Sequence, residues 1–223
     1  MSNTVLVVAA HTDDEALGCG GTIARHVAEG DIVYCIFIAD GVSSRDAIGE
    51  KDLEIRNLAA ERARLILGIS QNYYLGMPDN RLDSLPLIDV VKRLEVIIRN
   101  LNPKIIYTHH PGDLNVDHSI AHKAVLTACR PLPGSSVTDI YAFEIISSTE
   151  WATPTALPFL PNYFVELGSH LSTKLDALRA YQQEMRKMPH SRSIEHSIHL
   201  ANHRGHSVGV ASAEAFVVIR TVR

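Results

Sequence analysis

Two near-continuous apolar runs, Thr4–Ala10 (TVLVVAA) and Ile32–Ala39 (IVYCIFIA), constrain the fold of this chain more than any other feature. Such runs are typical of strands that helices cover on both faces, as in parallel sheets. The segment between them, Glu15–Glu29, has apolar residues at helical spacing and is followed by Gly30, a common residue after a helix end. A strand, a helix and a second strand in this order predict a parallel pair joined by a right-handed crossover.

The same alternation continues and predicts an α/β fold, a Rossmann-like three-layer sandwich with a mostly parallel sheet. The further strands expected in it are Asn72–Leu75, Lys104–Thr108 and Asp139–Ile146, and its further helices are Lys51–Leu67, Pro86–Leu101 and about Asp117–Cys129. After a Pro- and Thr-rich stretch, Ser147–Pro161, the expected elements are a strand at Tyr163–Leu167, helices at Ser172–Met185 and Ser193–His203, and a strand at Ala215–Arg220. We take this last third as a C-terminal elaboration of a single domain, residues 1–223.

Composition narrows the class of protein. The formal charge of −4 gives no electrostatic reason to expect nucleic-acid binding. The apolar runs are strand-sized, so we expect no membrane span. The first strand follows Met1 almost directly without an export signal, and the 3 cysteines are widely spaced, which favours a cytoplasmic protein without a disulfide framework.

Candidate metal ligands follow two of the predicted strands. His11, Asp13 and Asp14 come after the first strand, and a second group, Asp113, Asn115, Asp117 and His118, comes after Lys104–Thr108. The carboxyl ends of parallel strands share one sheet edge, where open α/β sheets bind ligands. A catalytic zinc commonly takes three protein ligands and keeps one open position. His11, Asp14 and His118 supply that set. A shared ion requires the imidazoles of His11 and His118 to lie within about 5 Å of each other.

Asp13 adjoins a candidate ligand without being needed as one. A carboxylate at that place can take a proton from an attacking water molecule and return it to a departing amine. The alternative is structural: Asp13 and Asp14 would simply cap the helix that begins near Glu15.

These residues also carry a family resemblance. The segment AHTDDE, with the later GDLNVDHSIAH, resembles the PIG-L/LmbE-like zinc-dependent de-N-acetylases, and so do Arg56 with Ala63 and Leu67-Gly68, LGMPDN, and RGHSVGVASAEAF. The resemblance implies a Rossmann-like fold, one Zn²⁺ per chain (other divalent metals being alternatives) and hydrolysis of an N-acetyl group on an amino sugar or its conjugate. It implies that His11, Asp14 and His118 hold the zinc and that Asp13 is the general base and acid. It places Arg56 and Asp79 among the substrate contacts and implies a homo-oligomer, an inference by analogy.

The chain departs from the family pattern at one position. Many members have a histidine, which helps to stabilise the oxyanion, where this chain has Asn115. Asn115 keeps an N–H donor, and His109, His110 and His206 are the other candidates; in some relatives a C-terminal histidine from an adjacent subunit serves. Asp117 and His122 are expected to contact the metal ligands without binding the metal, although His122 can equally be a helix-packing residue.

Other interpretations remain open at this stage. The Gly18-Cys19-Gly20-Gly21 stretch resembles a dinucleotide fingerprint, but Ile23 occupies the third glycine position and the acidic residues before it would repel a pyrophosphate. These glycines are better explained by close packing of the helix on the sheet. A non-catalytic zinc- or carbohydrate-binding module is a further alternative. Trp151 either stacks on a sugar ring or covers the core, and the stripe formed by His196, His199 and His203 is best explained as a solvated face.

Overall fold

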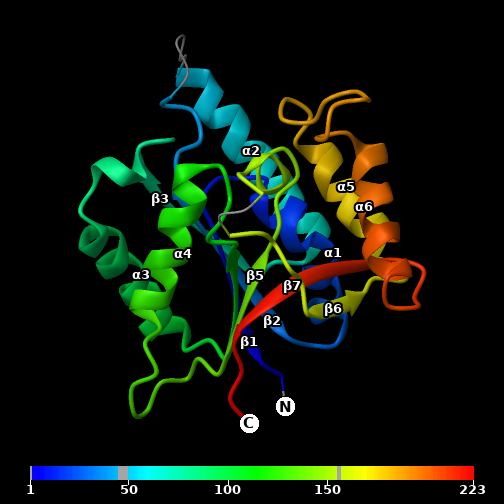
Figure 1. The fold of residues 1–223 in the computed structure, drawn as a ribbon. Helices are drawn as coiled ribbons and strands as arrows, with labels where there is room; N and C mark the ends of the chain where they lie inside the picture. The colour runs from blue at the N-terminus through cyan, green and yellow to red at the C-terminus, as the bar shows by residue number, and fades with distance from the viewer. Residues whose placement is uncertain (1, 45–49, 155–156) are drawn as a thin grey trace.

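A computed structural model describes residues 2–44, 50–154 and 157–223 and shows one seven-stranded sheet between two layers of helices (Figure 1). The strands are β1 (Thr4–Ala9), β2 (Ile32–Ala39), β3 (Gln71–Met77), β4 (Ile105–His109), β5 (Asp139–Phe143), β6 (Tyr163–Glu166) and β7 (Ala213–Arg220). The helices are α1 (Asp14–Ala28), α2 (Glu50–Leu67), α3 (Leu87–Leu101), α4 (Val116–Ala128), α5 (His170–Ala180) and α6 (Ile194–His206), with 3₁₀ turns η1 (Leu82–Ser84) and η2 (Thr149–Trp151).

The strand order, β3-β2-β1-β4-β5-β7-β6, creates a switch point between β1 and β4. From β1 the chain first builds the sheet outward through β2 and β3, and it later returns to add β4 on the other side. The strands β1 to β5 are parallel, whereas β7 and β6 join antiparallel. Loops diverge at such a switch point, so the carboxyl ends of β1 and β4 enclose a natural binding crevice.

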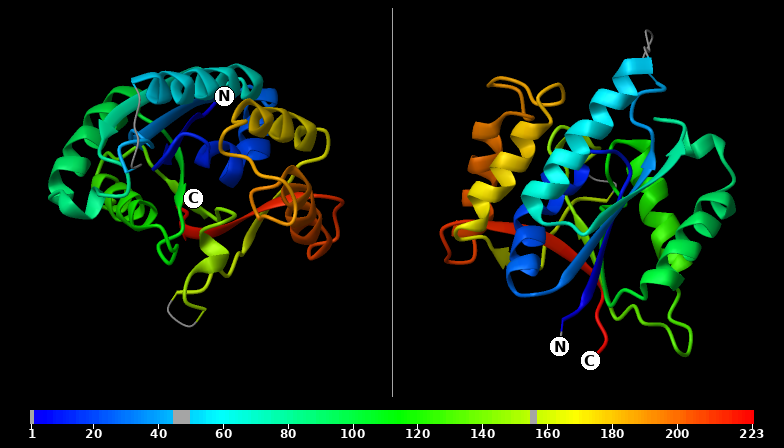
Figure 2. Two further views of the ribbon diagram at one scale, coloured as in Figure 1. Left: turned by 90° about the horizontal axis from the view of Figure 1, so that it is seen from above. Right: turned by 180° about the vertical axis from the view of Figure 1, so that it is seen from behind.

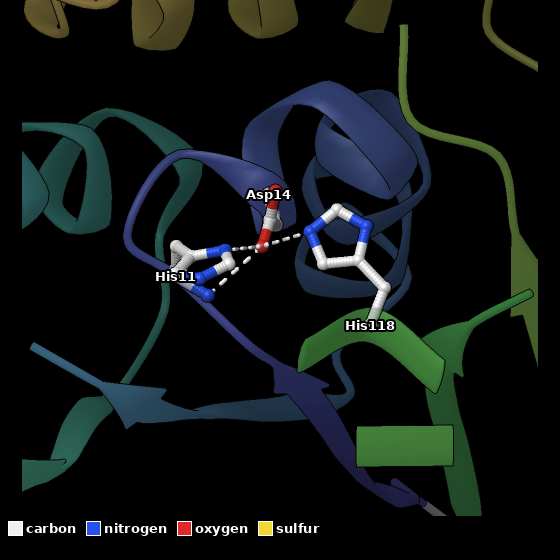
Figure 3. Close-up of side chains that lie close together, drawn as sticks. All are labelled: His11, Asp14 and His118. Carbon is white, nitrogen blue, oxygen red and sulfur yellow. Dashed lines mark hydrogen bonds and ion pairs between the residues drawn. The ribbon is translucent and has the colours of Figure 1, made fainter. Parts of the chain in front are cut away.

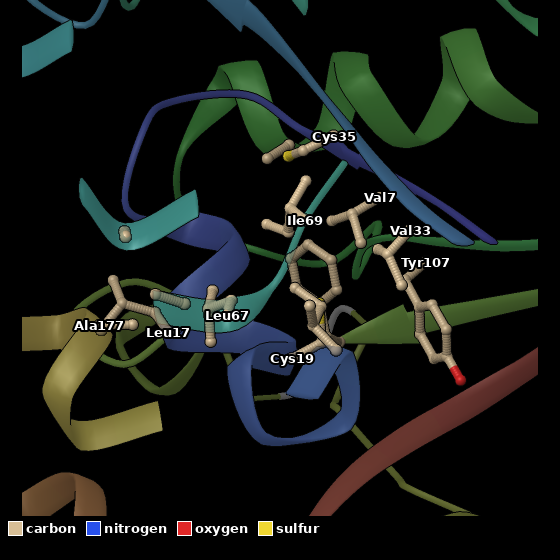
Figure 4. Packing of buried hydrophobic residues seen from close by; sticks show 14 of the residues in the cluster. Val7, Leu17, Cys19, Val33, Cys35, Leu67, Ile69, Tyr107 and Ala177 are labelled. Atoms are coloured by element: carbon tan, nitrogen blue, oxygen red, sulfur yellow. The ribbon is translucent and has the colours of Figure 1, made fainter. Parts of the chain in front are cut away.

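Alternate residues of β1 serve two separate cores, which explains its near-continuous apolar run. Val5 and Val7 pack with residues of α1, α2 and α5, and Leu6 and Val8 pack with residues of α3 and α4. Figure 2 shows these helix layers on opposite faces of the sheet, and Figure 4 shows part of the first core. The predicted three-layer sandwich with a mostly parallel sheet is therefore confirmed.

Helix α1 is broken at Cys19, whose backbone is not helical (φ −147°, ψ 23°). A buried ion pair from the last third of the chain satisfies the freed backbone groups: Lys174 Nζ donates to the carbonyl of Leu17 (2.7 Å), and Glu214 accepts from the N–H groups of Gly21 (3.0 Å) and Thr22 (2.7 Å). Lys174 and Glu214 themselves lie 2.6 Å apart. The C-terminal elaboration thus supports the helix that begins at the candidate site.

The glycines of α1 have the packing role expected from the sequence. A side chain at Gly18 would overlap the ring of Phe143, and a Cβ atom at Gly21 would lie 2.6 Å from Cδ2 of Leu167. No pyrophosphate is needed to explain this glycine-rich stretch.

Two elements end earlier in the structure than the sequence predicts. The helix predicted to end at Met185 stops at Ala180, because Tyr181 leaves helical geometry and buries its ring, with its hydroxyl donating to Glu15 Oε1 at 2.6 Å. The strand predicted to reach Ile146 stops at Phe143, and the chain turns at Ser147 (φ 66°). Both early ends send irregular segments over the carboxyl edge of the sheet. Within the described ranges, no helix combines the length and apolar character needed to cross a bilayer.

Candidate metal centre and reaction pocket

His11, Asp14 and His118 come together at the switch point between β1 and β4. Figure 3 shows the Asp14 carboxylate between the two imidazoles. Its Oδ2 atom lies 3.3 Å from His11 Nδ1 and 3.4 Å from His118 Nε2, and one ligand atom from each residue lies within 4.8 Å of the others. The ring centroids of the two histidines are 5.4 Å apart, slightly more than the expected 5 Å, but their facing nitrogens are closer.

This geometry fits a divalent metal ion. Tetrahedral ligands at 2.0–2.1 Å from zinc lie about 3.3–3.4 Å from one another, which matches the separations between Asp14 and the two imidazoles. The second carboxylate oxygen, Asp14 Oδ1, is buried and has no hydrogen-bond partner among the described residues. A buried carboxylate oxygen without a partner is unfavourable unless a cation approaches it.

The ring nitrogens that face away from this cluster have carboxylate neighbours. His11 Nε2 lies 3.1 Å from both Asp117 Oδ2 and Asp79 Oδ1, and His118 Nδ1 lies 3.1 Å from Asp113 Oδ1. Metal-binding histidines usually have such a partner, which fixes the ring and its tautomer. The predicted supporting position of Asp117 therefore matches its contacts.

Asp117 is held in turn by the backbone. Its carboxylate accepts hydrogen bonds from the N–H groups of Asn80 (2.7 Å) and Leu82 (3.0 Å). His11, Asp79 and Asp117 also form a cluster with ligand atoms within 4.8 Å. Both oxygens of Asp117 are engaged, however, and Asp79 accepts a hydrogen bond from Ser44, so Asp14 offers the freer ligand.

Asp113 connects His118 to the segment after β5. It accepts hydrogen bonds from the hydroxyls of Ser148 and Thr149 (2.6 Å for Thr149). Burial alone would raise the pKa of Asp113, but His118 and these hydroxyls lower it to about 2. Burial alone would lower the pKa of His118, but Asp14 and Asp113 raise it to about 9, so a metal ion must displace a proton there.

Asp13 occupies the N-cap position of α1, but its side chain makes no capping hydrogen bond, so capping does not explain its carboxylate. It adopts a left-handed backbone conformation (φ 110°), and its buried carboxylate accepts a hydrogen bond from Arg192 Nη1 (2.7 Å) at Oδ2. Its other oxygen, Oδ1, lies 3.7 Å from Arg56 Nη2 and has no hydrogen-bond partner among the described residues. Burial raises the pKa of Asp13, and the guanidiniums of Arg192 and Arg56 oppose that rise.

Glu15 holds the backbone of Asp13 by a hydrogen bond. The N–H of Asp13 donates to Glu15 Oε2 at 3.0 Å, and the hydroxyl of Tyr181 donates to the other oxygen of Glu15. Burial raises the pKa of Glu15 to about 8, an effect larger than that of these hydrogen bonds. The side chain of Glu15 supports the turn that carries Asp13 through its hydrogen bond to the backbone.

A polar pocket of about 180 Å³ opens beside Asp13. Its lining comes from six segments of the chain: His11, Asp13, Gly41, Ser44, Arg56, Asp79, Asn80, Asn115, Glu184 and Arg192. Three of the predicted substrate contacts, Arg56, Asp79 and Asn115, are among them, whereas His206 is exposed at the end of α6 and does not line it.

Arg56 differs from what its helix pattern alone indicates, a solvent-exposed side chain. It is only 7% exposed and donates to Thr12 Oγ1 (2.7 Å), the Thr12 carbonyl (2.8 Å) and Glu184 Oε1 (2.8 Å). The loop after α5 covers this part of α2, which no periodic pattern reveals.

The remaining histidines have other partners, although His109 borders the cluster: its Nε2 lies 3.4 Å from Asp14 Oδ2 and its ring stacks on that of His118 at 3.9 Å. His109 Nε2 accepts from the N–H of Ala10 (2.8 Å), His110 Nε2 lies 2.8 Å from the carbonyl of Leu157, and His122 Nδ1 lies 2.8 Å from the carbonyl of His109. Of the four oxyanion candidates, Asn115 is the one that lines the described pocket. Its side chain also accepts from the N–H of Asp117, and its Nδ2 donates to Asn80 Oδ1 at 3.2 Å.

Trp151 and the histidine stripe of α6 do not line the pocket. Trp151 is 54% exposed and meets His190 edge-to-face at 6.0 Å, so it does not cover the core; stacking on a sugar stays a prediction. Of the stripe predicted to be solvated, His199 and His203 are exposed, whereas His196 is half-buried.

Sequence reasoning did not identify Arg192 or Glu184 as site residues. Both lie in the irregular stretch between α5 and α6, without a motif or period to single them out. What the two residues share is a charged side chain in a loop. This loop reaches the site because α5 ends early.

Known proteins resemble this chain in sequence and in fold. Residues 6–129 match the family described as PIG-L, GlcNAc-PI de-N-acetylase. The "uncharacterized deacetylase YaiS" of Escherichia coli is 32% identical over 184 residues, covering 80% of this chain and 90% of that protein. The "probable N-acetyl-alpha-D-glucosaminyl L-malate deacetylase 2" of Bacillus cereus is 29% identical over 199 residues, covering 86% and 90%.

Among solved structures, the N,N'-diacetylchitobiose deacetylase of Pyrococcus horikoshii aligns with a TM-score of 0.80 and 22% identity, covering 98% of this chain and 84% of that one. At this identity the structural likeness shows the fold alone. The family match, which spans more than half of the chain and includes both ligand-bearing segments, carries the assignment. The chain belongs to the PIG-L (GlcNAc-PI de-N-acetylase) family.

Proposed function

We propose that this protein is a zinc-dependent hydrolase that removes the acetyl group from the nitrogen of an amino sugar or an amino-sugar conjugate. The observation that carries the proposal is the position of Asp14 between His11 and His118, with the Asp13 carboxylate beside them at the pocket wall. The names of the relatives, which include deacetylases of glucosaminyl malate and diacetylchitobiose, support the substrate class.

His11, Asp14 and His118 would hold the zinc ion, which when bound polarises the acetyl carbonyl and lowers the pKa of a water molecule. Asp13 takes a proton from water as the water oxygen attacks the carbonyl carbon. The bond between carbon and nitrogen then breaks, and Asp13 returns the proton to the nitrogen. The products are acetate and a free amine, so no further reactant is required.

The pocket suits a hydroxylated substrate. Asp79 and Asn80 present oxygen and nitrogen atoms to it, and Arg56 is fixed in place by Thr12 and Glu184. We propose that Arg56 and Asp79 bind sugar hydroxyls and that Asn115 donates to the developing oxyanion, where one donor can be worth about 3 kcal/mol in the barrier.

Acetate release from a panel of N-acetylated sugars tests this proposal. The panel contains free and nucleotide-linked N-acetyl sugars, disaccharides, a thiol-conjugated glucosamine and a glycopeptide antibiotic precursor. We expect release from at least one substrate, loss of activity after metal removal and recovery with zinc. Activity that survives complete metal removal contradicts the proposal, and sugar binding without acetate release favours a binding module.

The Asp13→Asn variant assigns the roles within the site. The amide cannot accept the proton, so we expect turnover to fall by about 10²–10⁴-fold while zinc content stays near that of the wild type. If the variant loses the metal as well, Asp13 is a ligand and the proposed role is wrong.

We also propose an oligomeric state and a cellular location. We expect a homo-oligomer from the family resemblance, which light scattering measures directly. We place the protein in the cytoplasm because Cys19, Cys35 and Cys129 are free and buried.

A further inference from the structure

Arg192 joins three separate parts of the site. Its Nη1 atom lies 2.7 Å from Asp13 Oδ2, its Nε donates to Ser147 Oγ at 2.6 Å, and its Nη1 also lies 4.0 Å from Glu184 Oε2. The guanidinium comes from the loop between α5 and α6, and 21% of the side chain is exposed at the pocket. The loop is outside the regular helices and strands, and hydrogen bonds to Asp13 and Ser147 hold the guanidinium in it.

Ser147 is the second hydrogen-bond partner of Arg192, and its backbone is strained. It has a left-handed conformation (φ 66°) although it is not glycine, and its N–H donates to Glu150 Oε1 at 2.6 Å. Non-glycine residues keep such a conformation only when the surrounding structure enforces it, often at functional sites. Here the strained turn presents a hydroxyl to Arg192.

The hydrogen bond from Arg192 leaves the two oxygens of the Asp13 carboxylate in different surroundings. Oδ2 is held by Arg192, while Oδ1 remains without a hydrogen-bond partner among the described residues. Oδ1 is also buried and lies 3.7 Å from Arg56 Nη2, a contact longer than a hydrogen bond. A fixed carboxylate with one hydrogen-bonded oxygen and one oxygen without a hydrogen bond is the arrangement that a general base needs, because only one orientation brings the accepting oxygen to the water molecule.

We propose that Arg192 is a positioning residue for Asp13: it fixes one carboxylate oxygen so that the other is aimed at the reacting water molecule. The inference rests on the proposed function of this site. Lysine is not an equivalent residue, because a single ammonium on a flexible stem cannot hold Asp13 and Ser147 in the fork geometry of a guanidinium.

Kinetics of the zinc-loaded full-length chain test the positioning role. For Arg192→Ala we expect kcat to fall about 10- to 100-fold with KM changed less than about 3-fold, as a misplaced catalytic group predicts. Zinc content should be unchanged, Arg192→Lys should recover only part of kcat, and guanidinium ions in solution should partly restore Arg192→Ala. A merely structural arginine would show no such rescue.

Arg204→Ala is the matched control. Arg204 also belongs to the last third of the chain and donates two hydrogen bonds of 2.7 Å to Glu144, but it does not line the reaction pocket. We expect its removal to leave kcat within about 2-fold of the wild type.

A crystal structure of zinc-loaded Arg192→Ala supplies a readout that does not depend on activity. We expect the Asp13 carboxylate to rotate or to occupy more than one rotamer, whereas it keeps one in the wild type. An unmoved carboxylate, or an unchanged kcat in an active enzyme, overturns the positioning role. If the wild type releases no acetate from any substrate, the proposed function fails instead, and the rotamer comparison still decides the role of Arg192.

Discussion

His11 Nε2 and Asp117 Oδ2 lie 3.1 Å apart although 106 residues separate them in the sequence. This contact joins the segment after β1 to the start of α4, and the backbone N–H groups of Asn80 and Leu82 fix its carboxylate. One aspartate therefore aligns a candidate metal ligand and ties three loops together.

Replacing Asp117 tests this alignment. We expect Asp117→Asn to lower metal affinity about 10- to 100-fold, because His11 loses the carboxylate that orients its ring. Competition with a chromogenic chelator measures the affinity. Asp89→Asn, an exposed carboxylate on α3, serves as the control and should bind metal like the wild type. Equal affinities of the Asp117 variant and the wild type would refute the orienting role.

The Lys174–Glu214 pair should dominate the stability of the broken helix α1. Removing one partner leaves a buried charge and unpaired backbone groups, so we expect Lys174→Met to lower the free energy of unfolding by about 3–5 kcal/mol. Urea denaturation measures the change. The exposed pair formed by Arg179 and Asp176, also 2.6 Å apart, is the matched control: Arg179→Ala should cost at most about 1 kcal/mol.

The close approach of α1 to the sheet gives a steric prediction. Gly18→Ala would place a methyl group against the buried ring of Phe143, and we expect a loss of about 1–3 kcal/mol. At Gly20, in the same helix, the nearest atom to an added Cβ would be Lys174 Cγ at 3.3 Å, so Gly20→Ala should be milder. Thermal melting of both variants provides the comparison, and an equal loss at both positions would contradict the packing argument.

Acid sensitivity should involve Asp139. Burial alone would raise its pKa, but hydrogen bonds from Thr138, Thr221 and Arg223 outweigh burial and hold the pKa below its ordinary value. A depressed folded-state pKa adds stability above the unfolded pKa of about 3.9, and that stability is lost as the pH falls through the folded value.

The corresponding variant is Asp139→Asn. We expect it to be less stable than the wild type at pH 7 and the difference to shrink toward pH 3, as measured by urea denaturation at both values. Asp83→Asn, at an exposed position of η1, should show no such convergence. A difference for Asp139→Asn that stays constant with pH would exclude this contribution.

The order of the first strands and helices was predictable because their apolar patterns are long and their faces are buried against other regular elements. The same patterns predicted the position of His11 and Asp14 at the carboxyl edge of the sheet, since polar residues directly after a buried parallel strand lie at the ligand-binding edge. His118 followed from the same reasoning applied to β4. Periodicity and strand direction together were sufficient for this half of the site.

The other half depends on irregular chain. Arg192 and Glu184 reach the pocket from a loop, and Arg56 is buried because that loop covers it, so none of the three has a periodic signal. The strained conformations of Asp13 and Ser147 are likewise tertiary effects, because the surrounding structure enforces them. Long-range ion pairs of this kind require coordinates.

Locating the bound metal tests the central claim most directly. The protein is crystallised with zinc, and anomalous scattering at the zinc edge gives the position of the ion. We predict one ion per chain at about 2.0–2.2 Å from His11 Nδ1, an Asp14 oxygen and His118 Nε2. An ion bound instead by His11 Nε2, Asp79 and Asp117, or no ion near His118, would contradict the proposed centre.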